Sequence, residues 1–303
     1  MAKRFFWLAT ILLSSVFILW IFTYSGKVSE ADVLYEKDFL DNYRIYAIPL
    51  PESLNFAGEA VPLDRYYVKE QFDRELLINS YWQSQTIQFF KRANRWFPVF
   101  EPILKQYNIP DDFKYLALIE SGLMNAVSPA GATGFWQILE GTGKDLGLEI
   151  NEFVDERYNV EKATVAACKY LLKSKEEYGS WTLAAAAYNM GNRGIQRQIE
   201  RQKVQSYYDL HLNEETSRYV FRILAMKVIF ENPQKAGFYY RETDLYPPLD
   251  YKTISVDSTI SCLVDFAQQN NTTYRELRLL NPWLRQYELP NKKGKAYEIK
   301  VPL

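Results

Sequence analysis

The stretch YLALIESGLMNAVSPAGATGFWQ, residues 115–137, contains a single carboxylate, Glu120, where an apolar run meets a glycine-containing loop. In a helix over residues 112–120, the positions three, four and seven residues before Glu120 share its face, and all three are apolar. Burial on that face would raise the pKa of the carboxyl, and the negative end of the helix dipole acts in the same direction. A carboxylic acid that stays protonated near neutral pH suits general acid catalysis, whereas a buried glutamate paired with Lys or Arg is the structural alternative.

The loop after this helix combines glycines with a polar and an aromatic element. Gly131 and Gly134 permit close backbone approach or left-handed dihedral angles. Gln137 offers an amide donor and acceptor beside the aromatic pair Phe135 and Trp136. An aromatic face next to an amide suits a sugar ring, and an ordinary tight loop with core aromatics is the alternative. No P-loop or GxGxxG pattern is present to indicate a phosphate site.

The composition of the 303 residues leaves carboxylates as the main chemical resource. One histidine, His211, and two cysteines, Cys168 and Cys262, give no His/Cys metal cluster and no CxxC motif, so neither a metal nor another cofactor is expected. The net charge of −1 argues against nucleic acid as a general partner. Because the two cysteines lie in different segments, we expect two separate free thiols rather than a disulfide formed after export.

The N-terminus has two basic residues followed by an uncharged, mostly apolar run from Phe5 to Tyr24. This length is close to what a helix needs to cross a bilayer, whereas a signal peptide has a shorter apolar region and a small-residue cleavage site. We therefore expect residues 1–24 to form an uncleaved anchor, with a cleaved signal segment as the alternative. The basic end should stay in the cytoplasm, so the rest would be exported and held at the inner membrane.

The remaining chain divides by its pattern of apolar residues. Residues 25–67 show no sustained period and contain three prolines, which predicts a linker or wrapping segment. Between residues 68 and 240 the spacing is helical, with a break expected near Pro98. An aspartate just after Pro110 is expected to cap the helix 112–120. Strand signals are scarce in this region, so an all-α domain is predicted.

Further helices are indicated by their end signals. They are predicted over residues 160–178 with Gly179 as the stop, from Ser180 through WTLAAAAYNM to Gly191, and from Asn213 to about Phe230.

The pattern of apolar and polar residues changes after residue 248. Residues 249–303 contain two β-like pieces, YKTISV and AYEIKVPL, around two predicted helices, Thr259–Gln268 and Thr273–Leu280. This pattern predicts a small α/β module. The expected fold class is therefore mainly α, with an α/β module at the C-terminus and a membrane helix at the N-terminus.

Four motifs occur in the order found in lytic transglycosylases of the soluble-lytic-transglycosylase (glycoside hydrolase family 23-like) fold. IESG (119–122) resembles the end of the catalytic helix of this family, and GATGFWQI (131–138) resembles its glycine-rich motif. AAYNMG (186–191) and EETSRY (214–219) are similar to its third motif and its last helix. Together they are specific, and the chain resembles in particular the membrane-bound murein transglycosylases of the D type, which carry C-terminal LysM modules.

The resemblance implies a lysozyme-like fold for residues 68–240 and cleavage of the β-1,4 bond between N-acetylmuramic acid and N-acetylglucosamine in peptidoglycan. Glu120 would protonate the leaving oxygen and would then remove the proton from the muramyl O6 hydroxyl. That hydroxyl would attack its own anomeric carbon and form a 1,6-anhydro end without water. One carboxylate suffices for this route, unlike the usual pair of a glycosidase.

The resemblance also implies roles for residues around Glu120. Tyr188 and Asn189 would orient Glu120 or the acetamido group of the substrate, and a simple helix end is the structural alternative. Glu215 would either face the cleft or only complement a helix dipole. Tyr219 would either line the sugar groove or pack in the core. The full set of implied substrate-binding residues is Ser121, Gly131, Gly134, Gln137, Tyr188, Asn189, Glu215 and Tyr219.

The tail over residues 249–303 resembles one degenerate LysM repeat, in which Asp257-Ser258 replaces the usual Gly-Asp. Glycan binding by this module and a buried structural role against the catalytic domain are therefore both open. The expected partners are peptidoglycan glycan strands and the inner membrane, and other cell-wall enzymes are undetermined. Two further functions remain: a goose-type-lysozyme-like hydrolase that uses water, and a non-catalytic cell-wall-binding or scaffold protein.

Overall fold

The computed structural model describes residues 30–41 and 46–303 and divides the chain into two compact units, Met1–Ala47 and Ile48–Leu303. The described part of the first unit is one helix, α2 (Glu30–Asp41), where no regular structure was expected. Acidic residues in its first turn favour the helix, but twelve residues are too few to show a sustained period. The anchor expected over residues 1–24 lies outside the described residues. Among those described, no helix combines the length and the apolar character needed to span a bilayer.

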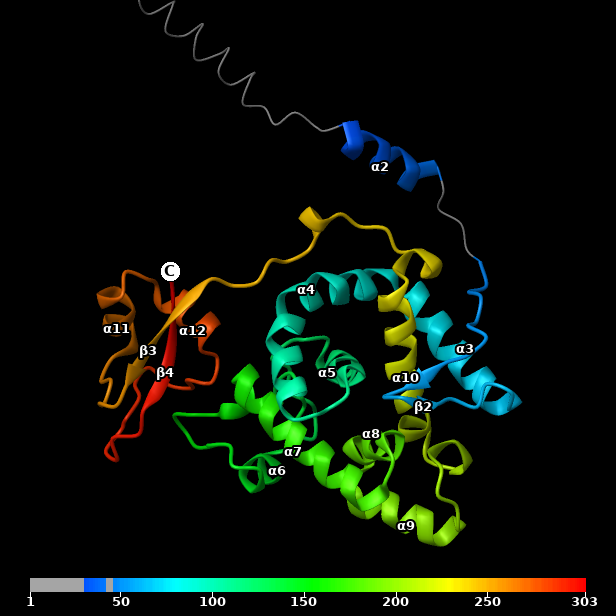
Figure 1. The fold of residues 1–303 in the computed structure, drawn as a ribbon. Helices are drawn as coiled ribbons and strands as arrows, with labels where there is room; N and C mark the ends of the chain where they lie inside the picture. The colour runs from blue at the N-terminus through cyan, green and yellow to red at the C-terminus, as the bar shows by residue number, and fades with distance from the viewer. Residues whose placement is uncertain (1–29, 42–45) are drawn as a thin grey trace, which may run out of the picture. The chain divides into compact units, whose positions relative to one another are not determined.

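The second unit is mainly helical, as the sequence predicted, and ends in a pair of strands (Figure 1). Its elements are β1 (Asn55–Phe56), β2 (Glu59–Ala60), α3 (Tyr66–Tyr81), α4 (Gln83–Gln106), η1 (Asp111–Phe113), α5 (Lys114–Ser121), α6 (Glu140–Asp145), η2 (Glu156–Tyr158), α7 (Val160–Tyr178), α8 (Trp181–Met190), α9 (Asn192–Gln202), η3 (Tyr207–Asp209), α10 (Glu214–Glu231), η4 (Pro233–Ala236), η5 (Glu242–Asp244), β3 (Tyr251–Val256), α11 (Leu263–Gln269), α12 (Tyr274–Leu280) and β4 (Tyr297–Pro302).

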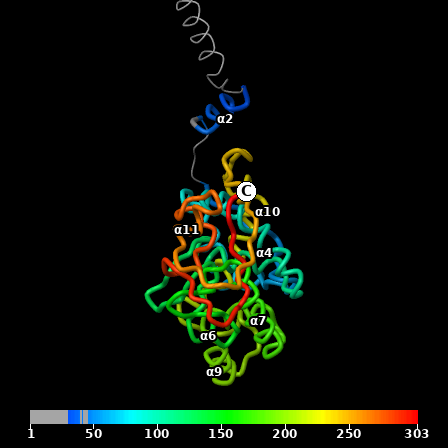
Figure 2. Tube along the Cα trace, turned by 90° about the vertical axis from the view of Figure 1, so that its left-hand side faces the viewer, coloured from blue at the N-terminus to red at the C-terminus, as the bar shows by residue number. Residues whose placement is uncertain are grey.

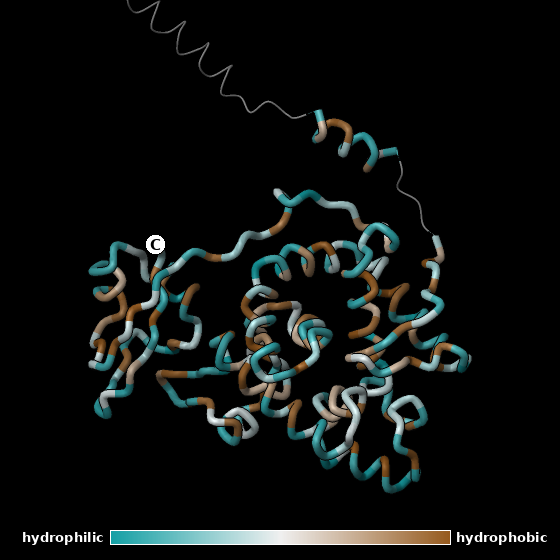
Figure 3. The backbone as a smooth tube through the Cα atoms, viewed as in Figure 1, coloured by the Kyte–Doolittle hydropathy of each residue, from teal (hydrophilic) through white to brown (hydrophobic). Residues whose placement is uncertain are grey.

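The helix α5 is the centre of the core. It contacts α4 and α10, and Figure 1 shows it within the ring that these helices form with α7 and α8. Leu116 and Ala117 are buried as predicted, but Tyr115 and Leu118 on the other sides are buried as well. Buried residues of α4, α5 and α10 belong to one hydrophobic core cluster, and Figure 3 shows the hydropathy of each residue along these helices. The spacing of apolar residues in the sequence therefore predicted one buried face, whereas the structure buries residues on all sides of α5.

The predicted end signals of three helices are confirmed. Asn159 and Ser180 accept hydrogen bonds at the N-termini of α7 and α8, and Gly179 ends α7 in a left-handed conformation. Asn213 accepts a hydrogen bond from Thr216 N–H at the start of α10. These caps fix where α7 ends and where α8 and α10 begin.

The helix break expected near Pro98 is wrong. The chain breaks at Trp82, between α3 and α4, and α4 continues through Pro98 and Pro102. Both prolines lie on the exposed side of α4, and Figure 1 shows the helix bending along its length. Burial of the aromatic residues on the inner side of α4 outweighs the two lost backbone hydrogen bonds.

The aspartate cap expected after Pro110 is also not formed. A short 3-10 turn precedes α5, and neither helix start has a side-chain cap. Asp111, the aspartate just after Pro110, instead pairs with the Lys114 ammonium at 2.6 Å. Asp112 accepts hydrogen bonds from Ala57 N–H at 2.7 Å and from the Lys227 ammonium at 2.8 Å, and so joins the β1–β2 hairpin to α10.

The C-terminal module is an α/β unit in which β3 and β4 pair antiparallel, with Tyr251 opposite Pro302. The helix expected to start at Thr259 begins at Leu263 instead. The reason is a two-way backbone pairing between Ile260 and Leu289, at 3.0 and 2.8 Å, which keeps this segment extended. Cys168 and Cys262 are free thiols in different elements.

The module packs directly on the helical region, and the view of Figure 2 looks from the module's side. Val154 and Tyr158, from the segment around η2, are buried in the same core cluster as Trp283 of the module. The Arg285 guanidinium lies 4.0 Å from the centre of the Tyr158 ring. A backbone hydrogen bond of 2.9 Å runs from Asp155 N–H to Trp283 C=O. The structural role that the sequence left open for the module is therefore observed.

Candidate active site

Glu120 lies near the C-terminal end of α5, half-buried at the edge of the core. The helix ends at Gly122, whose left-handed φ of 61° turns the chain into the loop. The Tyr219 hydroxyl donates a hydrogen bond to Oε1 of Glu120. Burial raises the pKa of Glu120, the Tyr219 bond and the positive charge of Arg222 oppose this effect, and the net direction is upward. The carboxyl is therefore biased toward the protonated form.

Tyr219 is the residue that holds this carboxyl in place. It is 1% exposed, so it packs in the core rather than lining a sugar groove. Burial and the negative charge of Glu120 raise the pKa of Tyr219 well above its usual range, so the phenol stays a hydrogen-bond donor. The orienting role expected of Tyr188 toward Glu120 is thus filled by a phenol from α10.

Tyr188 and Asn189 bridge elements around the acid. The Tyr188 hydroxyl donates to the backbone oxygen of Trp136 at 2.7 Å, and the pKa of Tyr188 is raised by burial and by the nearby charge of Glu120. Asn189 donates to Glu215 at 2.9 Å and accepts from the Thr216 hydroxyl at 2.7 Å. The end of α8 is thereby fixed both to the glycine loop and to the start of α10.

The glycine loop is closed by hydrogen bonds of its own. Gly134 has φ of 82°, and a Cβ at this position would lie 2.1 Å from the backbone oxygen of Arg157. The Gln137 amide donates to the backbone oxygens of Ala126 and Gly134, at 3.0 and 2.8 Å. Gly131, with φ of 78°, is exposed and has open space around it. Because Gly134 has no side chain, the backbone of this loop can approach the backbone at Arg157 closely.

Ser121 and the aromatic pair serve the packing of the loop. The Ser121 hydroxyl is buried and donates to the backbone oxygen of Phe135 at 2.8 Å. The interpretation of Phe135 and Trp136 as a sugar-stacking face is wrong, because they are 2% and 0% exposed. Trp136 donates its indole N–H to the Thr164 hydroxyl at 2.8 Å within the core.

Arg157 anchors the loop from outside. Its guanidinium donates to the backbone oxygens of Gly131 and Ile138, at 3.1 and 3.3 Å. The same group forms a buried ion pair with Asp155 at 2.7 Å. Because Asp155 N–H is bonded to Trp283 of the C-terminal module, one continuous set of contacts connects that module to the loop beside Glu120.

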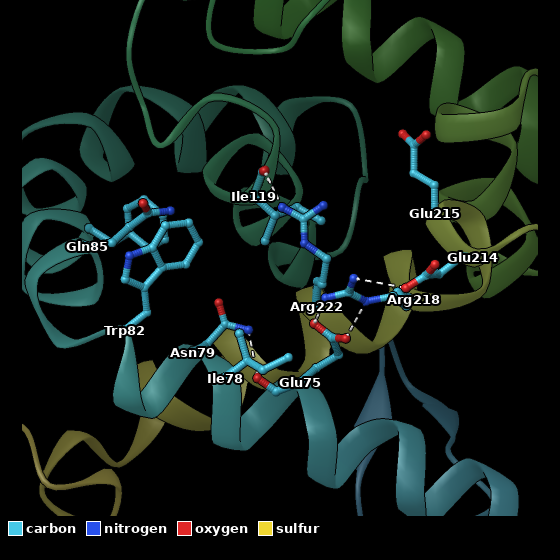
Figure 4. A pocket seen from close by; sticks show the side chains of 11 residues that line it. Glu75, Ile78, Asn79, Trp82, Gln85, Ile119, Glu214, Glu215, Arg218 and Arg222 are labelled. Carbon is cyan, nitrogen blue, oxygen red and sulfur yellow. Dashed lines mark hydrogen bonds and ion pairs between the residues drawn. The ribbon is translucent and has the colours of Figure 1, made fainter.

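An open groove of about 490 Å³ lies between α3, α4 and α10 (Figure 4). It reaches Ile119, the residue before Glu120, and Arg222, whose guanidinium donates to the Ile119 backbone oxygen at 3.0 Å. Its lining consists of Glu75, Ile78, Asn79, Trp82, Gln85, Phe89, Ile119, Glu214, Glu215, Arg218 and Arg222.

Comparison with known protein families agrees with this geometry. Residues 98–210 match the family described as "Transglycosylase SLT domain". Residues 252–303 match the family described as "Soluble lytic transglycosylase C-terminal LysM-like domain". The chain carries an SLT domain and a LysM-like domain.

Two curated relatives, both named "Membrane-bound lytic murein transglycosylase D", come from Escherichia coli strain K12 and from Escherichia coli O6:H1 strain CFT073. Each is 30% identical to this chain over 183 residues. The alignment covers 58% of this chain and 40% of each relative, so the chain spans well under half of the relatives it matches.

Most of the groove comes from residues outside the range matched by the SLT domain. Trp82 and Gln85 precede residue 98, and Arg218 and Arg222 follow residue 210. Arg218 lies in the EETSRY motif (214–219), whereas Trp82, Gln85 and Arg222 belong to no motif, so no local signal marks those three. Only the periodicity of the flanking helices pointed to ordered structure there.

The carboxylates near the groove are engaged by neighbours. Glu75 is 1% exposed and receives two hydrogen bonds from Arg218, at 2.6 and 3.3 Å. Glu215 is exposed and accepts from Asn189. Within residues 30–41 and 46–303, no three His, Cys, Asp or Glu residues come together in a way that would hold a metal ion.

Proposed function

We propose that this protein is a peptidoglycan lytic transglycosylase acting in cell-wall remodelling. It would cleave the β-1,4 bond between N-acetylmuramic acid and N-acetylglucosamine and leave 1,6-anhydromuramic ends. The observation that carries the proposal is the placement of Glu120 in the SLT domain, with a raised pKa and a phenol bonded to it, beside an open groove. The names of the two E. coli relatives support the same activity.

In the first step, protonated Glu120 gives its proton to the glycosidic oxygen as the bond to the anomeric carbon breaks. The N-acetylglucosamine side leaves with a free hydroxyl, and the substrate's own acetamido group stabilises the positive charge at the muramyl carbon. In the second step, the Glu120 carboxylate takes the proton from the muramyl O6 hydroxyl while O6 bonds to the anomeric carbon. Glu120 returns to its protonated form, and no water is consumed.

A single free carboxyl group supports this route over a two-carboxylate mechanism. Glu75 is neutralised by its ion pair with Arg218, and Glu215 is held by Asn189 at the surface. Tyr219 would position the acid through its hydrogen bond, and the loop closed by Gln137 would shape the adjoining wall. Ser121, Gly131, Gly134, Tyr188 and Asn189 would act on the substrate mainly by holding this geometry.

We further propose that residues 1–24 anchor the protein in the inner membrane, with the SLT and LysM-like domains on the periplasmic side. Their apolar run and flanking basic residues support an anchor, and both relatives are named as membrane-bound. Glycan strands of peptidoglycan would be the partner of the exported part. Extraction of the full chain from membranes by detergent, and not by alkaline carbonate, is the expected result.

The activity is tested by digesting purified peptidoglycan and weighing the soluble fragments. Wild-type protein should release fragments with anhydro ends, each one water lighter than the hydrolysis product. Glu120→Gln keeps an acceptor for the Tyr219 hydroxyl but has no proton to give, so release should fall by about 10³-fold or more. Its unfolding curve, measured alongside, should show a folded protein.

Other outcomes would identify the alternatives. Fragments carrying an added water would indicate a goose-type-lysozyme-like hydrolase. Binding to peptidoglycan without fragment release from wild-type protein would indicate a non-catalytic wall-binding protein. Full activity of the Glu120→Gln variant would remove Glu120 from the mechanism.

A further inference from the structure

We infer that Trp82, at the joint between α3 and α4, is a stacking platform for a sugar ring of the glycan strand, with Gln85 and Asn79 binding the polar groups of that ring. The inference rests on the proposed function, because it names the part of the groove that would take the strand next to Glu120. Trp82 lies before the segment matched by the SLT domain, and no motif of the sequence marks it.

The first observation is the exposure of a large aromatic side chain inside a concave site. Trp82 is 54% exposed and lines the groove of about 490 Å³ (Figure 4). Across the described part of the chain, its indole makes no ring contact with another aromatic residue or a cation. An indole face left open in a groove of this size is free to pack on the C–H face of a sugar.

The second observation is that the platform is held rigidly. The Trp82 backbone N–H donates to Ile78 C=O at 2.9 Å, and its own C=O accepts from Gln85 and Thr86 N–H at 3.1 and 3.0 Å. The buried Thr86 hydroxyl also donates to the Asn79 backbone oxygen at 2.5 Å, which closes the joint. Because the backbone at Trp82 is fixed before a ligand binds, ordering of the backbone adds little to the entropy cost of stacking on the indole.

The third observation is that amide side chains able to form further hydrogen bonds lie beside the Trp82 ring. Asn79 donates its amide N–H to the Glu75 backbone oxygen at 2.7 Å, which leaves its side-chain oxygen as an acceptor. The Gln85 amide has no hydrogen-bond partner among the described residues, so both its donor and its acceptor face the groove. An aromatic face flanked by free carboxamides matches a sugar that carries hydroxyl and acetamido groups.

The groove extends from this platform to Ile119, the residue before Glu120. Ile119 and Arg222 line the same groove, and the charge of Arg222 acts on the Glu120 carboxyl. A strand held on Trp82 would therefore continue toward Glu120. The platform would fix the register of the strand, so that the bond to be cleaved meets the acid.

The test measures glycan binding without cleavage, in the Glu120→Gln background of the full chain. A soluble oligomer of N-acetylglucosamine is titrated against the single variant and against the double variant with Trp82→Ala, with binding followed by calorimetry. We expect the double variant to bind about tenfold more weakly, equivalent to about 1.4 kcal/mol. Trp82→Phe should recover most of the affinity, because it restores an aromatic face.

Tyr66→Ala provides the matched control, since Tyr66 is an exposed aromatic at the other end of α3 and does not line the groove. It should bind like the Glu120→Gln protein. Equal affinity of the Trp82→Ala and Tyr66→Ala variants for the oligomer would overturn the inference. It would also be overturned if both variants lost binding and both showed a lowered unfolding midpoint. In the active enzyme, Trp82→Ala should raise KM more than it lowers kcat.

The two proposals fail in different ways. If wild-type protein cleaves peptidoglycan and Trp82→Ala leaves binding unchanged, the platform is wrong and the transglycosylase assignment stands. If wild-type protein does not cleave while Trp82 still governs oligomer binding, the assignment is wrong and the platform stands. No binding of the oligomer to the Glu120→Gln protein would remove the platform.

Discussion

On one side of Glu120 the glycine loop is closed by hydrogen bonds between its own groups, and on the other side the groove leaves Trp82 and Gln85 unpaired (Figure 4). The loop side carries residues of the glycine-rich motif, and these residues contact or hydrogen-bond backbone atoms of the loop and its neighbours. The groove side includes motif residues, Ile119 of IESG and Glu215 and Arg218 of EETSRY, but its unpaired side chains, Trp82 and Gln85, belong to no motif. Residues of the glycine-rich motif thus close the loop after α5, and the unpaired side chains of the groove lie at the joint between α3 and α4.

The difference has a physical reason. A loop that must hold a fixed shape beside a half-buried acid needs left-handed dihedrals and satisfied backbone groups, which restricts its residues to particular types. A groove that binds a chain of sugars needs exposed aromatic and amide groups on a rigid scaffold, and several residue types on several helices meet that need. Substitutions on the loop side should therefore lower stability, and those on the groove side should change binding or the pH profile.

The largest effect is expected on the loop side, from Gly134→Ala. The added Cβ would lie 2.1 Å from the Arg157 backbone oxygen, and φ of 82° is strained for alanine. The free energy of unfolding should fall by about 3 kcal/mol in a urea titration. Gly131→Ala is the control, because its φ of 78° carries similar strain but its surroundings are open, and it should cost about 1 kcal/mol. Equal losses would show that the loop does not depend on the contact with Arg157.

An intermediate effect is expected at the acid itself, from Tyr219→Phe. The Tyr219 hydrogen bond lowers the pKa of Glu120, so its removal should raise that pKa further. Because Glu120 must be protonated to act, the alkaline limb of the kcat/KM profile should move to higher pH. The looser carboxyl should also reduce kcat by about tenfold. An unchanged profile would show that the phenol does not set the protonation of the acid.

The smallest effect is expected on the groove side, from Glu215→Gln. The negative charge of Glu215 raises the pKa of Glu120, so its removal should move the alkaline limb to lower pH, opposite to Tyr219→Phe. The amide still accepts from Asn189, so the end of α8 should keep its place. Stability should change by less than about 0.5 kcal/mol, as for other surface sites. A shift in the same direction as Tyr219→Phe would contradict the electrostatic explanation.

Much of the helical framework could be predicted because its signals are local. The caps at Ser180 and Asn213 and the stop at Gly179 depend on residues within one turn of the helix end. The cap expected from the aspartate after Pro110 was not formed, because Asp111 pairs with Lys114 and Asp112 binds a hairpin and a lysine from distant segments. The break near Pro98 was misplaced for a similar reason, since burial on the inner side of α4 carries the helix through the proline.

By itself, the sequence pointed to Glu120 as the carboxyl proposed to act as the acid, because this residue ends an apolar helix ahead of a glycine loop. The tertiary structure decided what surrounds it. Tyr219, which is 99 residues away, rather than Tyr188 donates to the acid. Phe135 and Trp136 are buried, and Trp82 is exposed in the groove. The physical reason is that helical period and capping act within a few residues, whereas burial and hydrogen-bond partners depend on which helices pack together.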